Sequence, residues 1–147
     1  MRRSFLRGGM IVVVVLALNG ALASTVLADN WPSDGTDPYT SGCAATGWRV
    51  FPATWTGTGW LTLHFSNGCA TAWAEFTCAS AGGCQNLTLW AKRFPDGKSM
   101  TVWVTWPSVV PNGWTIHTPQ LFDGGAYATQ AFEQGYFGAP VFWTGRY

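Results

Sequence analysis

The stretch from Trp60 to Trp106 constrains the fold most, because two hairpin-turn signals divide it into short segments. Asn67-Gly68 and Asp96-Gly97 are dipeptides that tolerate the positive φ angles of a two-residue hairpin turn. The flanking segments are rich in Thr, Val and Trp, which favour strands. Gly and Pro recur too often for a long amphipathic helix. The pattern predicts four consecutive antiparallel strands.

Two-residue turns at these positions also predict the strand registers. Leu63 would lie opposite Ala72, and Trp90 would lie opposite Trp103. A slip of one residue would move every side chain to the other face, so the register decides what is buried. One face then carries only apolar residues and is the predicted core: Leu61, Leu63, Phe65, Ala72, Ala74, Phe76, Leu87, Leu89, Val102 and Val104.

The opposite predicted face combines tryptophans with hydroxyl and charged side chains. Indole rings offer broad apolar surfaces, and neighbouring polar groups can orient a ligand, which is typical of surfaces that bind sugars or extended peptides. The alternative is that the C-terminal third folds over this face and buries it as a second core. The candidate binding residues are Trp60, Trp73, Trp90, Trp103, Lys92 and Thr101.

Outside this stretch the sequence predicts a loop and three shorter strands. Residues 29–42 are rich in Pro, Ser, Gly and Asp, which favours a loop. Residues 114–117, 126–132 and 141–143 are the candidate strands. The predicted fold class is therefore all-β, a small antiparallel sandwich or partly closed barrel stabilised by two disulfides. Residues 29–147 are expected to form a single secreted β domain.

The four cysteines are expected to form disulfides. Their spacing lacks the C-x₂-C pairs typical of metal sites, so no metal site is predicted. A Cys78–Cys84 bond would close the short loop between two predicted strands, which leaves Cys43–Cys69 as the second bond. Cys78 and Cys84 would fall on opposite faces of continuous strands, so a bulge must intervene. Spacing alone leaves the other two pairings open.

Residues 1–28 resemble a secretory signal peptide. Three arginines precede an apolar run of residues 10–18, and small residues follow. The run is too short to span a bilayer as a helix, which needs roughly 20 residues. Cleavage is expected after Ala28, with Ala23 as the alternative. The sequence thus predicts a secreted, extracellular protein without a stable membrane anchor once the signal is removed.

Charge and motifs exclude several function classes. Loss of the signal leaves five basic residues against seven acidic ones, so nucleic acid is not an expected partner. No phosphate-binding loop or H-E-x-x-H motif is present, and no cofactor is predicted. His64 and Glu75 share a predicted face, but the predicted register places them too far apart for a direct hydrogen bond. His117 has no assignable neighbour, so we expect no catalytic residues.

Two segments resemble a known family. Residues 34–44 (DGTDPYTSGCA) and 61–74 (LTLHFSNGCATAWA) are similar to motifs of the YjfA-like family, small secreted bacterial proteins of unknown function. The similarity covers about residues 33–75 and implies export and a structural role for Cys43 and Cys69. Ser33 stands where the family often has a cysteine, and His64 and Glu75 stand where it has arginines.

Together these features predict a non-enzymatic extracellular binding module. The expected partner is cell-envelope polysaccharide, meaning polysaccharide of the cell wall. The alternative is a secreted domain that interacts with or inhibits another extracellular protein. A small extracellular hydrolase is the third interpretation. Exposure of the tryptophans is the observation that separates a binding face from a second core.

Overall fold

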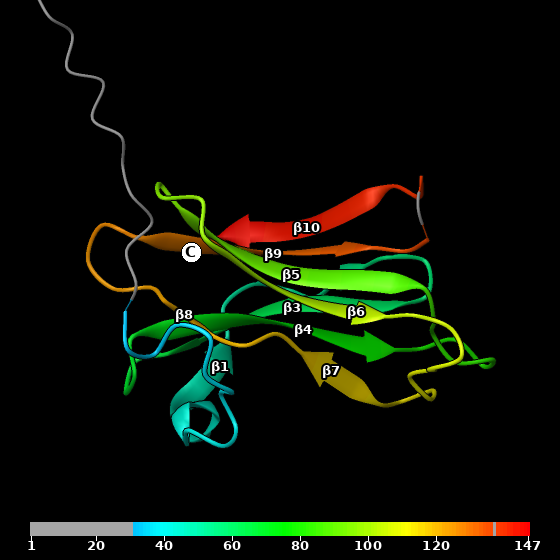
Figure 1. Cartoon of the computed structure of the whole chain (residues 1–147), viewed down its shortest axis with the longest axis horizontal. Helices are drawn as coiled ribbons and strands as arrows, with labels where there is room; N and C mark the ends of the chain where they lie inside the picture. Colours follow the sequence, from blue (N-terminus) through cyan, green and yellow to red (C-terminus); the bar gives the residue numbers. More distant parts are fainter. Residues whose placement is uncertain (1–30, 137) are drawn as a thin grey trace, which may run out of the picture.

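The chain forms two antiparallel β-sheets packed face to face, which confirms the all-β sandwich (Figure 1). The computed structural model describes residues 31–136 and 138–147. The predicted signal peptide, residues 1–28, lies outside them. No helix in the described segments has the length and apolarity needed to cross a membrane.

The first sheet has six strands in the order β1-β3-β4-β7, with β2 beside β3 and β8 beside β4. A short 3-10 helix, η1 (Cys43–Thr46), leads into it. Its strands are β1 (Gly47–Arg49), β2 (Thr54–Trp55), β3 (Gly59–Ser66), β4 (Thr71–Cys78), β7 (Thr115–His117) and β8 (Leu121–Phe122).

The second sheet has four strands in the order β10-β9-β5-β6. These strands are β5 (Leu87–Phe94), β6 (Ser99–Val104), β9 (Ala128–Gln134) and β10 (Val141–Arg146). The three strands predicted in the C-terminal third correspond to β7, β9 and β10. The predicted loop before residue 42 consists of turns over its described part.

The four predicted strands are present, but the two hairpins lie in different sheets, so the expectation that all four strands share one core face and one opposite face is wrong. β3 and β4 pair in the first sheet, and β5 and β6 pair in the second. Each hairpin has one apolar face, and stacking the two hairpins buries both faces at once. A side-by-side arrangement would have left both faces in need of another cover.

The predicted core face is the observed core except at Val102, which is only half-buried. Its residues from β3, β4 and β5 meet between the sheets, where Leu61, Leu63 and Leu89 are completely buried. β9 adds Ala131, and β10 adds the half-buried Phe142. The core therefore fills the space between the two layers. The outer face of the first sheet is covered along β4, where both faces of the strand are buried.

Both hairpin registers differ from the predicted ones by two residues. Leu63 pairs with Ala74, and Trp90 pairs with Thr101 rather than Trp103. The turns are longer than two residues, since Ser66 and Thr71 form the last pair of the first hairpin. A shift of two residues preserves the face of every side chain, so the predicted core survives this error.

Both predicted disulfides are present, Cys43–Cys69 and Cys78–Cys84. The expected irregularity between Cys78 and β5 is also present. Gly83 and Asn86 both have positive φ, at 79° and 54°, and these residues interrupt the strand alternation. The chain crosses from the first sheet to the second in this segment.

Candidate functional site

The outer face of the second sheet carries a row of aromatic side chains across three strands. Trp143 of β10 pairs with Phe132 of β9, and Phe132 pairs with Trp90 of β5. The rings of Trp90 and Phe132 stack, with centroids 5.2 Å apart and planes 4° apart. Trp103 of β6 lies on the same face, paired with Thr88. We call Trp90, Trp103, Phe132 and Trp143 the aromatic platform.

The platform is open to solvent at both sides. The exposed fraction of Trp103 is 68% and that of Trp143 is 58%, while Trp90 and Phe132 are half-buried. The exposed indole rings are not packed in the core, so their apolar surface is available to a ligand. The alternation of β5, β6, β9 and β10 therefore directs large aromatic rings outward as well as apolar residues inward.

Polar side chains surround these rings. Thr101 pairs with Trp90, and Thr88 lies between Trp103 and Gln134. Lys92 lies one position further along the outer face of β5, with its ammonium 5.3 Å from the centroid of the Phe94 ring. A shallow hollow of about 360 Å³ runs beside Trp103. The hollow is lined by Asn86, Leu87, Thr88, Trp103, Val104, Thr105, Gln134, Gly135 and Tyr136.

The structure brings together four of the six predicted binding residues. Trp90, Trp103, Lys92 and Thr101 share the outer face of the second sheet. Trp60 lies on the outer face of the first sheet, so the expectation of a single shared face is wrong. The reason is that the two hairpins stack with their apolar faces together, which turns their other faces away from each other.

Trp73, the sixth predicted binding residue, is buried, with an exposed fraction of 1%. The segment around η1 covers it, and a Cβ added at Gly47 would lie 2.4 Å from its ring. The sequence left open whether the C-terminal third covers the tryptophans. The covering segment is N-terminal instead. Of the four tryptophans predicted to bind a ligand, it covers Trp73 and no other.

Trp60 contributes to a separate surface on the first sheet. Its ring lies 4.9 Å from that of Trp55 on the neighbouring strand β2, centroid to centroid. A hollow of about 420 Å³ adjoins Trp60. The hollow is lined by Arg49, Ala53, Trp60, Thr62 and Thr77.

Glu75 is the centre of a hydrogen-bond network on the same sheet. Its Oε1 accepts hydrogen bonds from the Tyr39 hydroxyl at 2.7 Å and the Trp73 indole at 2.8 Å. Its Oε2 lies 3.3 Å from His64 Nε2, so the predicted separation of His64 and Glu75 is wrong. The shift in register places Glu75 opposite Thr62, next to His64. Burial lowers the pKa of His64, and the Glu75 carboxylate opposes that shift.

A second pair joins the N-terminal segment to β7. His117 Nε2 lies 2.9 Å from Asp37 Oδ2, and the hydrogen bond lowers the pKa of Asp37 to about 2. Burial and Glu75 raise the pKa of Tyr39 to about 12, so its phenol remains a hydrogen-bond donor to Glu75. These contacts hold residues 37–39 against the sheet. Both histidines are engaged by carboxylates that fix the N-terminal segment, which gives them a structural explanation.

A family model described as a protein family of unknown function, DUF2690, matches residues 32–132. The chain belongs to the DUF2690 family. No curated protein and no solved structure is significantly similar to it.

The DUF2690 match includes both disulfides, the first sheet, β5, β6 and most of β9. It includes three residues of the aromatic platform and ends at Phe132. Trp143, on β10, lies beyond the matched DUF2690 region. The platform in this chain therefore combines a face built within the family region with a tryptophan supplied by the last strand.

Phe132 and Trp143 were not among the predicted binding residues. Period-two alternation in residues 128–134 was the available signal for Phe132, because it places this ring on the face opposite the buried Ala131 and Glu133. Residues 141–143 are all apolar, so no alternation marked Trp143. The sequence did not indicate that β9 pairs with β5, which is what brings Phe132 onto Trp90. Long-range pairing of this kind depends on the whole sheet.

Proposed function

We propose that this chain is a non-enzymatic extracellular binding module that adsorbs to cell-envelope polysaccharide through the aromatic platform. The observation that carries the proposal is the row Trp143-Phe132-Trp90, continued by the exposed Trp103. A contiguous exposed aromatic surface on a soluble domain is a mark of an interaction site.

Sugar polymers suit this surface chemically. The faces of sugar rings carry C–H groups that pack on indoles, and their edges carry hydroxyls that need hydrogen-bond partners. Thr88, Thr101, Gln134 and Lys92 lie around the rings of the platform and can serve those hydroxyls. Two disulfides in a small domain suit an oxidising, extracellular setting.

A binding assay on isolated, insoluble cell walls tests the proposal. Replacing Trp103 or Trp143 with Ala should weaken retention by ~1–3 kcal/mol, the scale of a central aromatic contact. Trp60→Ala is the matched control, because Trp60 is an exposed indole on the other sheet. This control variant should be retained like the unmodified protein.

Thermal unfolding of the same variants separates loss of binding from loss of folding. The exposed indoles of Trp103 and Trp143 contribute little to the core, so both variants should stay folded. Equal retention of all variants would overturn the platform as the binding surface. Failure of the unmodified protein to bind any cell-wall fraction would overturn the polysaccharide ligand.

One observation favours a second candidate function, interaction with another extracellular protein. The loop between β6 and β7 lies beside the Cys78–Cys84 disulfide and exposes Trp106, Val109 and Trp114. A backbone bridge between Cys84 and Val110 anchors this loop. Exposed aromatics on an anchored loop are typical of protein interfaces. Loss of a protein partner on Trp114→Ala, with cell-wall retention unchanged, would support this second function.

A further inference from the structure

Glu133 is a buried carboxylate at one end of the sandwich. It lies on β9, points between the sheets opposite Leu89, and has an exposed fraction of 2%. Its Oε2 has no hydrogen-bond partner among the residues that the structure describes. An unpaired buried charge is costly, so such a group calls for an explanation.

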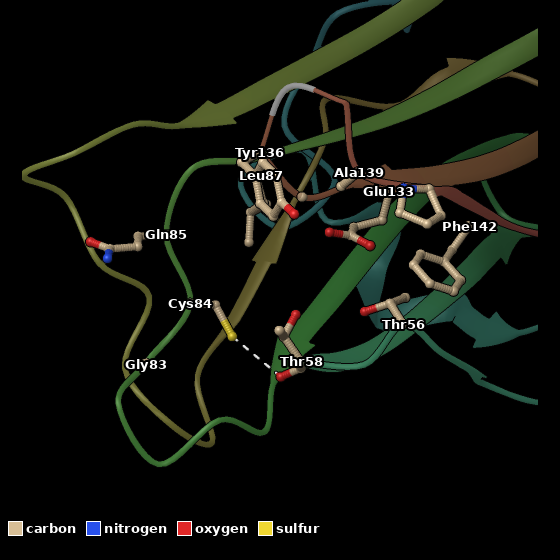
Figure 2. A pocket seen from close by; sticks show the side chains of 12 residues that line it. Thr56, Thr58, Gly83, Cys84, Gln85, Leu87, Glu133, Tyr136, Ala139 and Phe142 are labelled. Atoms are coloured by element: carbon tan, nitrogen blue, oxygen red, sulfur yellow. Dashed lines mark hydrogen bonds between the residues drawn. The ribbon is translucent and has the colours of Figure 1, made fainter.

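The carboxylate borders a pocket of about 360 Å³. Figure 2 shows it directed into the space between Leu87, Thr58 and Phe142. The walls are mostly apolar, with Tyr136 at one side and the Cys78–Cys84 disulfide nearby. No cationic side chain is among the described residues that line the pocket. The volume is that of a small-molecule site.

Arg93 shows what a paired buried charge looks like in this chain. Arg93, on β5 at the opposite end of the same sheet, bonds to the carboxylates of Asp34 and Asp96. Glu133 faces the same interior but has no counter-charge on the pocket wall. Burial raises the pKa of Glu133 to about 7, and the Thr56 hydroxyl opposes this shift. A bound cation would supply the missing partner.

We propose that this pocket binds an organic cation, an ammonium or guanidinium group on a small apolar body, with Glu133 as its counter-ion. The apolar walls would take the body, and the carboxylate would take the charged head. Charged hydrogen bonds to a desolvated carboxylate are short and strong, which gives selectivity for a cation over a neutral analogue. The proposal does not rest on the polysaccharide function, because Glu133 lies between the sheets and the aromatic platform lies on the outer face of the second sheet.

Benzylammonium is a suitable probe, with benzyl alcohol as its neutral match. The purified, disulfide-bonded protein should bind benzylammonium in a titration followed by amide NMR shifts around Glu133. Glu133→Gln should weaken benzylammonium at least about tenfold and leave benzyl alcohol unchanged. Asp37→Asn, the same chemical change at an exposed carboxylate, is the matched control and should bind like the unmodified protein.

The pH dependence adds an independent readout. Because Glu133 must be ionised to act as counter-ion, benzylammonium affinity should fall by about tenfold or more from pH 8 to pH 5.5. Tyr136 is the other titratable side chain among the described lining residues. Affinity for benzylammonium that is insensitive to both pH and Glu133→Gln would overturn the proposal.

The cation could be a free amine or an amino group on a polymer. Tyr136, Leu87 and Gly135 line both this pocket and the hollow beside Trp103, so the two sites adjoin. Glucosamine oligomers with free amines, compared with their N-acetylated forms, distinguish the two sources. Binding of the free-amine oligomers that depends on Glu133 indicates a polymer, and binding of benzylammonium alone indicates a small molecule. Failure of both probes to bind below about 5 mM would overturn the proposal.

Discussion

Arg93 and Asp34, fifty-nine positions apart in the chain, form a buried ion pair with Nη1 2.9 Å from Oδ2. Asp34 also accepts a hydrogen bond from the Phe122 backbone N–H, at 2.6 Å. Arg93 bonds in addition to Asp96, in the β5–β6 turn. The guanidinium thus joins the N-terminal loop, β8 and this turn at one end of the sandwich.

Replacing Arg93 with Met should lower the free energy of unfolding by ~3–5 kcal/mol, because the buried Asp34 and Asp96 carboxylates would lose their main counter-charge. Urea unfolding followed by tryptophan fluorescence measures the loss. Lys92→Met is the control, since Lys92 is the preceding residue and points outward. A loss below about 1 kcal/mol for Arg93→Met would contradict the structural role of the pair.

Glu133 should make the protein less stable as the pH rises. Its pKa is raised from 4.5 to about 7 in the folded protein, so the folded state holds a proton that the unfolded state has released. Its contribution is fully present below about pH 4.5 and is lost as the pH rises through 7. Relative to the unmodified protein, Glu133→Gln should therefore gain about 3 kcal/mol between pH 4.5 and pH 8.

Denaturant unfolding of both proteins across this pH range gives the difference directly. Asp123, whose pKa burial raises to about 6, is retained in both proteins, so its contribution cancels. The lowered pKa of His64 makes the protein less stable as the pH falls below the ordinary pKa of histidine, which is the opposite pH dependence. His64 is also retained in both proteins, so its contribution cancels as well. Parallel stability curves for the two proteins would show that Glu133 ionises normally in the folded state.

Gly97 provides a test of backbone strain without a packing change. Its φ is 75°, and no atom lies within 4 Å of a Cβ built on it. Gly97→Val should therefore destabilise the protein by about 1–2 kcal/mol through its backbone conformation alone. Gly97→Asn should cost less, because Asn tolerates the left-handed region. Thermal unfolding ranks the variants. Equal melting temperatures for Gly97→Val and the unmodified protein would show that residue 97 does not need a left-handed conformation.

The hairpins show how far local patterns determine a β fold. The alternation around Leu61, Leu63, Leu87 and Leu89 identified the core face correctly, although both turns were predicted two residues too short. The face survives because the side-chain period of a strand is two, and a shift of two leaves it unchanged. The same shift changes which residues pair across the strands, so the His64–Glu75 contact and the Trp90–Thr101 pair were not predicted.

The candidate site was predicted in part for the same reason. Trp90, Trp103, Lys92 and Thr101 lie on a single hairpin, and its local alternation was enough to group them. Trp60 and Trp73 lie on the other hairpin, whose position relative to the first is not encoded by alternation. Phe132 and Trp143 joined the site through pairing of β9 with β5 and of β10 with β9.

The sequence by itself determined the all-β class and the apolar faces of the hairpins, because these depend on period and turn chemistry. Cysteine spacing favoured the two disulfides but left other pairings open, and the structure decided between them. The tertiary structure decided which strands pair, which outer face each tryptophan occupies and which buried charges meet a partner. These features depend on contacts between distant segments, such as Arg93 with Asp34 and Phe132 with Trp90. The two hairpins stack with their apolar faces together. Their other faces therefore point in opposite directions, and the tryptophan face that the sequence predicted as one surface is divided between two sheets.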